Sequence, residues 1–334
     1  MQVGNQKTLS VVATCYNGAQ FLPTFFNCIN NQTYQNLQLI LVSDGSTDGS
    51  LGLIKDFCKS RENCIWIDSN NQGVASAKDK GLVMASGEWV TFCDVDDILH
   101  PMHFENLVTA IESSNADVAV CGFKRISAKK AVKFDPRKIK FKNQKVEIFD
   151  KDQAFSQYFS QEKFDFLLVN KIFRLSVVRR TGARFMEGTR YGEEAYFAYN
   201  FFKGAEKTAL IKAQTYYYVQ WKNSLMHTGF NPSRLDIYKN INAVIEDCQK
   251  EMPHLSHYVN SMRSGYSCGM LLFMKKSKFL DANLISEIIE SLKLDCKKLK
   301  LCKKTAGYKR AFIPLVVPVA KMVFAKTLKK LKQN

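Results

Sequence analysis

The chain has 334 residues, of which 48 are lysine or arginine and 31 are aspartate or glutamate, so its formal net charge is +17 at pH 7. With 46% hydrophobic and 24% charged residues it has a globular composition, which excludes disordered, collagen-like and low-complexity classes. A chain of this length buries about three quarters of its unfolded surface and needs no metal or disulfide to fold.

The sequence gives expectations about compartment and redox state. No run of about eighteen apolar residues occurs, so we expect no helix that spans a membrane. The polar N-terminal residues lack the parts of a secretory signal, which favours a cytoplasmic location. The ten cysteines form no Cys-x-x-Cys pair, and most lie in apolar surroundings. This pattern predicts reduced thiols that fill the core.

In chain order, short β-rich runs alternate with helical patterns. Such alternation predicts an α/β fold with a mostly parallel sheet and helices on both faces. Residues 148–218 have a mixed α/β pattern, and the pattern beyond residue 223 is mainly helical. The expected strands cover residues 9–14, 37–42, 64–68, 89–93 and 118–121, and the expected helices cover residues 21–31, 51–58, 74–85 and 102–113.

Polar clusters directly follow three of the expected strands. Residues 14–18 follow the first strand, residues 43–50 the second, and residues 94–97 the fourth. Ligands of such folds bind outside the carboxyl ends of the strands. We therefore expect the three clusters to meet at one edge of the sheet.

The strongest chemical signal is the group Asp94, Asp96 and Asp97. In an extended chain Asp94 and Asp96 point the same way, and crowded carboxylates repel unless a cation neutralises them. Oxygen ligands favour Mg²⁺ or Mn²⁺, which usually also bind substrate phosphates. The alternative is a helix N-cap, which explains Asp97 but hardly all three acids.

Other candidate residues are ambiguous when taken alone. Asp44 either belongs to a turn or accepts hydrogen bonds from a base or ribose. Glu193 and Glu194 either favour a helix dipole or supply a general base. His227 is either a surface residue or a ligand to metal and phosphate. No Gly-x-Gly-x-x-Gly or Gly-Lys-Ser/Thr loop is present, which argues against dinucleotide and P-loop phosphate sites.

The positive charge is concentrated in two stretches. Residues 293–334 contain thirteen lysines or arginines and one acid. The pattern of residues 321–332 suits a basic amphipathic helix, which either lies on an anionic membrane or docks on the core. A second basic stretch, residues 124–145, has no clear period and is interpreted as a loop or insertion. It is either simply solvated or meets a phosphate-bearing or lipid-linked substrate. We expect no nucleic-acid partner.

Together these motifs make the sequence resemble the family 2 inverting glycosyltransferases with a GT-A fold. The resemblance covers about residues 8 to 228. It rests on the stretches LSVVATCYNG (9–18), NQTY (31–34), SDGSTD (43–48), GEWVTFCDVDD (87–97), Pro101, NKIF (170–173), Phe185 and YGEE (191–194). It implies a GT-A glycosyltransferase domain over residues 1–222, with a donor half of about 1–122 and an acceptor half of about 123–222. Residues 223–334 would form a helical C-terminal region with a basic tail.

The resemblance also implies a reaction, in which a sugar passes from a nucleotide diphosphate donor, most often UDP-linked, to an acceptor hydroxyl with inversion. Glu194 falls at the position of the catalytic carboxylate, with Glu193 as the alternative, and Asp97, near the donor sugar, would be a second catalytic residue. The metal, Mn²⁺ or Mg²⁺, would be bound by Asp94, Asp96 and His227. The donor-binding residues would be Thr14, Tyr16, Asn17, Asp44, Lys78, Asp94, Val95 and Trp221.

Some residues depart from the family pattern, most clearly the pair Lys78-Asp79, which stands where Arg-Asn is usual. Lys78 keeps the positive charge but lacks a bidentate fork. The expected acceptor is a glycan, glycolipid or glycoprotein in bacterial surface polysaccharide synthesis, with the enzyme peripheral on the inner face of the membrane. The alternatives are a nucleotidyltransferase acting on sugar phosphates and a non-catalytic sugar-nucleotide binder at the membrane surface.

Overall fold

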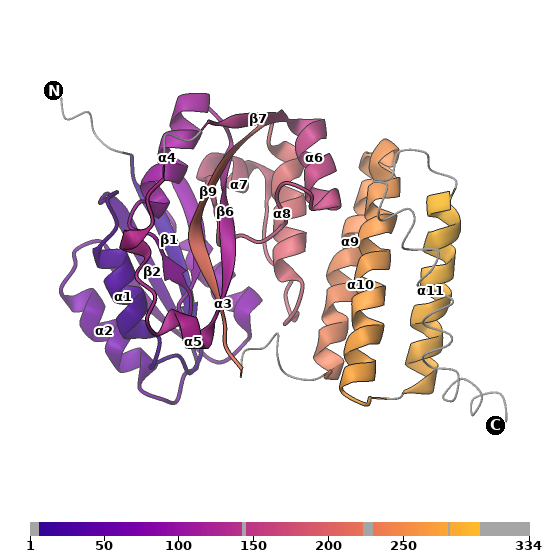
Figure 1. Cartoon of the computed structure of the whole chain (residues 1–334), viewed down its shortest axis with the longest axis horizontal. Coiled ribbons are helices and arrows are strands. Elements are labelled where there is room, and N and C mark those ends of the chain that lie inside the picture. Colours follow the sequence, from indigo (N-terminus) through magenta and orange to yellow (C-terminus); the bar gives the residue numbers. More distant parts are fainter. Residues whose placement is uncertain (1–6, 142–144, 223–229, 280, 301–334) are drawn as a thin grey trace. The chain divides into compact units, whose positions relative to one another are not determined.

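The computed structural model describes residues 7–141, 145–222, 230–279 and 281–300 (Figure 1). The chain separates into two compact units. One unit, here called the sheet unit, comprises Met1–Phe155 and Phe166–Ser224. The other, the helical unit, comprises Ser156–Asp165 and Leu225–Asn334. Residues 156–165 thus group with the C-terminal helices, although they lie inside the stretch that resembles a glycosyltransferase.

A nine-stranded sheet forms the centre of the sheet unit, in the order β3-β2-β1-β4-β8-β6-β9-β5, with β7 paired to β9. The strands are β1 (Leu9–Cys15), β2 (Leu37–Asp44), β3 (Cys64–Ser69), β4 (Trp89–Asp94), β5 (Ile98–Leu99), β6 (Val118–Ser127), β7 (Glu147–Asp150), β8 (Lys171–Arg174) and β9 (Lys207–Gln220).

The first four strands are all parallel, as the alternating pattern predicts. Beyond them the sheet is mixed, because β8 runs antiparallel to both β4 and β6, whereas β6 and β9 are parallel. In the β1–β4 register Thr14 lies opposite Asp94, and in the β1–β2 register Cys15 lies opposite Ser43. The three polar clusters therefore meet at one edge of the sheet, which confirms the prediction.

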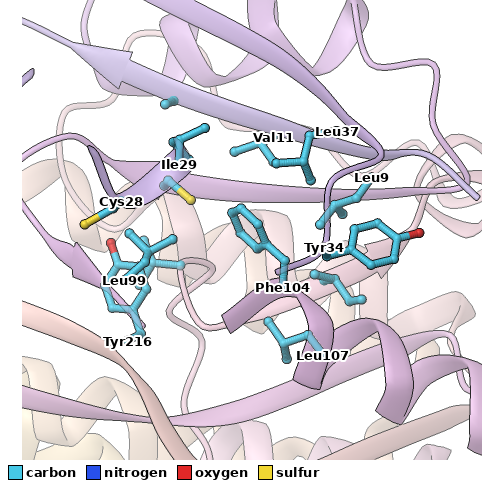
Figure 2. Packing of buried hydrophobic residues seen from close by; sticks show 14 of the residues in the cluster. Leu9, Val11, Cys28, Ile29, Tyr34, Leu37, Leu99, Phe104, Leu107 and Tyr216 are labelled. Atoms are coloured by element: carbon cyan, nitrogen blue, oxygen red, sulfur yellow. The ribbon is translucent and has the colours of Figure 1, made fainter. Parts of the chain in front are cut away.

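One face of the sheet is covered by α1 (Leu22–Asn30), α2 (Ser50–Lys59) and α4 (His103–Ser114). Alternate residues of β1 and β2, such as Leu9, Val11 and Leu37, pack there against Phe104 and Leu107 of α4, as Figure 2 shows. Burial of this contiguous apolar surface is the main force that holds the helices on the sheet.

The opposite face carries α3 (Val74–Val83), α7 (Leu175–Thr181) and α8 (Glu193–Gly204). Helix α3 lies very close to the sheet, because a Cβ at Gly81 would collide with Val12 of β1. Phe92 of β4 makes edge-on contacts with Phe185 and with Phe197 of α8, both at 5.3 Å between ring centroids. The close approach of α3 and this aromatic cluster hold α3 and α8 against the sheet.

Two sequence interpretations need correction. The strand expected at residues 118–121 continues to Ser127, so the basic stretch begins as β6 rather than as a loop. It then forms α5 (Ala128–Ala131) and the 3₁₀ turn η1 (Pro136–Lys138). Cys58 and Cys64 form a disulfide, so not all the cysteines are reduced. Cys58 lies at the end of α2 and Cys64, six residues later, at the start of β3. These two elements are adjacent in the fold.

Among the residues of the helical unit that the structure describes, three long helices occur, α9 (Asp236–Glu251), α10 (Ser256–Lys276) and α11 (Ala282–Lys300), with the turns η2 (Pro232–Leu235) and η3 (Pro253–Leu255). Helix α6 (Lys151–Ser160), which lies earlier in the chain, is divided between the two units. Met274, Ile285 and Leu292 are fully buried in an apolar cluster between α10 and α11. In the part of the chain that the structure describes, no helix is long and apolar enough to cross a membrane. The predicted amphipathic tail, residues 321–332, lies outside the described residues.

Candidate active site

The loops that follow β1 and β2 are joined by hydrogen bonds between their polar side chains and backbone. Asn17 has a positive φ of 48°, which an asparagine tolerates, and its side-chain oxygen accepts from the Thr47 N–H at 2.8 Å. The Asn17 N–H donates to Ser46 Oγ at 3.1 Å, and the Ala19 N–H donates to Asp48 Oδ2 at 3.0 Å. The two loops therefore form one rigid polar surface at the edge of the sheet.

Asp44, the last residue of β2, organises the loop that leads into α3. Its carboxylate is buried and accepts from the backbone N–H groups of Gln72 at 2.9 Å and of Gly73 at 2.8 Å. Gly45 has a φ of +70°, and a Cβ there would collide with Asn71 of the same loop. Since each carboxylate oxygen has a second lone pair, Asp44 retains acceptor capacity for a ligand. Its predicted role in nucleoside binding stays a prediction.

The acidic turn after β4 is fixed by β9 from the other end of the sheet. Asp97 is buried, and its carboxylate accepts from Tyr216 Oη at 2.6 Å and from the Val219 N–H at 2.8 Å. Tyr216 Oη also accepts from the Asp94 N–H at 3.4 Å. The indole N–H of Trp221 donates to the backbone oxygen of Asp96 at 2.9 Å. Asp97 thus anchors the turn, whereas Asp94 and Asp96 are only partly buried.

The electrostatics of this turn favour a cation. Burial, together with the nearby charge of Asp94, raises the pKa of Asp96 to about 7. Burial and the charges of Asp96 and Asp94 also raise the pKa of Asp97 well above its ordinary value. A divalent cation would remove this repulsion. Two partly exposed carboxylates fit Mg²⁺ or Mn²⁺, which bind one or two carboxylates and complete their shell with phosphates and water.

No cluster of three or more acidic, histidine or cysteine side chains within the described residues is arranged to hold a metal ion by itself. His227, the third predicted ligand, lies outside the described residues. The donor set that the structure does describe is therefore Asp94 and Asp96, and a ligand would have to supply most of the remaining oxygens.

A buried lysine connects the start of α8 with the acidic turn. Lys78 of α3 is 3% exposed, and its Nζ lies 2.7 Å from Glu194 Oε1 and 3.2 Å from Glu193 Oε1. Although burial by itself lowers the pKa of Lys78, the charges of Glu194, Glu193 and Asp94 raise it above its ordinary value. Burial raises the pKa of Glu194, against the opposing effect of Lys78. Lys78 therefore stays charged and holds both glutamates near Asp94.

The remaining predicted residues line the same edge of the sheet. Tyr16 is 56% exposed and presents its ring to solvent, Thr14 is partly buried opposite Asp94, and Val95 is buried against Gly18. Trp221 packs on Phe21, with 4.8 Å between ring centroids. Their roles in donor binding stay predictions.

Sequence reasoning missed Tyr216 and Phe21, which position the acidic turn and Trp221. Tyr216 lies in β9, 119 residues after Asp97, and reads in the sequence as one of three consecutive tyrosines in a buried strand. Only the pairing of β9 with β5 and β6 shows which of the three reaches the acids.

The fold is an α/β sheet with a polar, acidic edge, and comparisons with known proteins identify the family. The family model described as Glycosyl transferase family 2 matches residues 10–181. The chain belongs to this family.

Individual relatives agree with this assignment. The chain is 28% identical over 249 residues to glycosyltransferase GlyG of Streptococcus pneumoniae, which covers 72% of this chain and 80% of GlyG. It is 24% identical over 227 residues to EpsJ of Bacillus subtilis, described as an uncharacterized glycosyltransferase, and the match spans 67% of this chain but only 64% of EpsJ. The crystal structure of S. aureus TarS 1–349 in complex with UDP-GlcNAc has a similar fold, with a TM-score of 0.67, 15% identity and coverage of 98% of this chain and 92% of that one.

Proposed function

We propose that the protein is a glycosyltransferase that moves a sugar from a nucleotide diphosphate donor, a UDP-sugar, to an acceptor hydroxyl with inversion. One observation carries this proposal. Lys78 holds Glu193 and Glu194 together and lies within electrostatic range of Asp94. This contact supports placing the proposed cation site and the proposed base, which are far apart in the sequence, in one site.

Each residue of the site has its own proposed role in sugar transfer. Tyr16, Thr14 and Asn17 offer a ring and polar groups for the nucleoside, and Lys78 offers a positive charge for the diphosphate. Glu194 is the proposed general base, because burial raises its pKa toward the range in which a carboxylate removes a proton from a hydroxyl efficiently. Placing the donor and the acceptor hydroxyl in one orientation supplies much of the rate enhancement.

Asp94 and Asp96 are the proposed ligands of Mg²⁺ or Mn²⁺, and Asp97 is a positioning residue that holds their turn. When bound, the cation supplies positive charge to the diphosphate leaving group. Tyr216 and Trp221 keep the turn in place through the Asp97 carboxylate and the Asp96 carbonyl.

The test is product analysis with a panel of UDP-sugars, with Mg²⁺ or Mn²⁺ present and then removed by a chelator. Donor hydrolysis needs no acceptor, so we expect UDP release that depends on the divalent cation and is nearly lost in Asp96→Ala. The control Asp56→Asn removes an exposed acid of α2 and should keep full UDP release. Release of pyrophosphate would instead indicate a nucleotidyltransferase, and binding of UDP-sugars without any release would indicate a non-catalytic binder.

The acceptor and the location belong to the same proposal. We propose that the acceptor is a glycan, glycolipid or glycoprotein of bacterial surface polysaccharide synthesis, as the sequence resemblance implies. We further propose that the basic tail holds the enzyme on the inner face of the membrane. Truncation before Lys309 should abolish binding to anionic vesicles, and unchanged vesicle binding would refute this part of the proposal.

A further inference from the structure

A dense group of exposed cations lies on residues 124–140, here called the basic shelf. The shelf begins at the end of β6 and continues through α5, both of which are labelled in Figure 1, and then through η1. Its single acid, Asp135, is paired with Arg137, with 2.8 Å between Oδ1 and Nε. Its exposed cations are Lys124, Arg125, Lys129, Lys130, Lys133, Arg137, Lys138 and Lys140.

The backbone of the shelf is fixed by aromatic side chains that face the protein. Phe134 packs on Tyr217, with 4.6 Å between ring centroids, and Phe141, just beyond the shelf, packs on His100 at 4.9 Å. The Ser127 side chain caps α5 by accepting from the Lys130 N–H at 3.4 Å. The cations therefore project from an ordered backbone. Binding of a ligand to this surface should cost little backbone conformational entropy.

The shelf adjoins the candidate active site through the pairing of β6 with β9. Lys124 lies opposite Tyr217 and Arg125 opposite Tyr218. In β9 these two tyrosines lie between Tyr216 and Val219, which both donate hydrogen bonds to Asp97. The pKa of Tyr218 is raised to about 12 by burial and by the charges of Asp97, Asp94 and Asp96, while Arg125 opposes this rise. Tyr218 therefore interacts electrostatically both with the acids of the site and with Arg125 of the shelf.

We propose that the basic shelf binds phosphate groups of the acceptor, so that the acceptor of this site is a phosphodiester-bearing polymer rather than a neutral glycan. This inference rests on the proposed function, because it names the acceptor class of that same reaction. Exposed ammonium and guanidinium groups bind phosphates strongly, and a local excess of one charge raises the concentration of an oppositely charged chain near the site.

The side chains of the shelf favour a polymer over a membrane surface. Segments that lie on a bilayer insert bulky apolar residues between the headgroups. Among the large apolar residues of the shelf only Val132 is strongly exposed, at 77%, whereas Phe134 and Ile139 pack against the core. A surface with many cations and one small apolar side chain suits phosphates that stay in water.

The experiment measures binding of a fluorescent poly(glycerol phosphate) oligomer to the full-length protein at low and moderate salt. The shelf variant carries Lys129→Gln, Lys130→Gln and Lys133→Gln, none of which lies in the proposed catalytic machinery. The charge-matched control carries Lys59→Gln, Lys207→Gln and Lys250→Gln, three exposed lysines outside the shelf. We expect about tenfold weaker binding in the shelf variant and nearly unchanged binding in the control. The salt dependence should also be shallower in the shelf variant.

Several results would overturn the inference. These are equal binding of the oligomer and of neutral dextran by the wild type, equal losses in the two triple variants, or shelf-dependent binding to phosphatidylglycerol vesicles but not to the oligomer. Donor hydrolysis, measured as UDP release, should be the same in the wild type and the shelf variant. If UDP release were absent from every protein, the proposed function would fail, whereas the binding comparison would still decide whether the shelf recognises phosphates.

Discussion

The edge of the sheet and the helical unit are held in shape by different forces. At the edge, the loops after β1, β2 and β4 are fixed by directional hydrogen bonds, such as those from Thr47 to Asn17 and from Tyr216 to Asp97. The helical unit is held by apolar burial between α10 and α11 and by the ion pair of Arg263 with Asp295. Changes at the edge should therefore affect chemistry more than folding, and changes in the helical unit should do the reverse.

The largest effect is expected at the two glutamates that share Lys78. Glu194→Gln should lower UDP release by about a hundredfold to ten-thousandfold, because it removes the proposed base but keeps the side chain's shape. Glu193→Gln leaves that base in place and should lower UDP release by less than tenfold, through weaker positioning of Lys78. Steady-state kinetics with a UDP-sugar measure both, and thermal unfolding should show that both variants fold. The opposite ranking would make Glu193 the base.

The counterpart in the helical unit is the buried ion pair. Asp295 is fully buried, and its Oδ2 accepts from Arg263 Nε at 2.8 Å. Asp295→Asn leaves the guanidinium without its counter-charge, which should lower the free energy of unfolding by about 3 kcal/mol while the folded protein still releases UDP. The control Glu251→Gln breaks an exposed pair with Lys250 and should cost less than about 0.5 kcal/mol. Equal melting temperatures for the two variants would contradict this account.

An intermediate effect is expected where the edge depends on Tyr216. Tyr216→Phe removes the hydroxyl that Asp97 and the Asp94 N–H share, so it should cost about 1–3 kcal/mol and lower UDP release. The control is the neighbouring Tyr217→Phe, because the Tyr217 hydroxyl is buried with no hydrogen-bond partner among the described residues. That variant should be nearly neutral. If both substitutions had the same effect on unfolding and on UDP release, Tyr216 would not be what positions the turn.

Part of the candidate site could be predicted from the sequence, and part could not. The meeting of the clusters around Asn17, Asp44 and Asp94 was predictable, because parallel strands bring their carboxyl ends to one edge. The pairing of Lys78 with Glu193 spans 115 residues and arises only when α3 and α8 pack on the same face. No local pattern carries that information.

The disulfide could not be predicted from the sequence, for a related reason. Cys58 and Cys64 lie in apolar surroundings like the other cysteines, and their spacing matches no metal or redox motif. Their proximity depends on how α2 turns into β3, with 5.0 Å between the two Cα atoms. Turn geometry of this kind is not encoded by residue type alone.

The smallest expected effect is a pH dependence of the free energy of unfolding that arises from Asp79. Burial raises the pKa of Asp79, next to Lys78, to about 6, and its carboxylate accepts from the Phe185 N–H at 3.2 Å. Because the folded state holds this proton more tightly than the unfolded state, Asp79 destabilises the protein fully above pH 6, and the penalty disappears as the pH falls toward about 4. Asp79→Asn keeps the acceptor without the charge, so it should raise the free energy of unfolding by about 1 kcal/mol at pH 7.5, a value reduced by solvent screening of this half-buried side chain. The gain should vanish near pH 4, and Asp56→Asn, at an exposed position of α2, serves as the matched control. Chemical denaturation across this pH range measures both, and a gain that persisted at pH 4 would show that ionisation of Asp79 is not its cause.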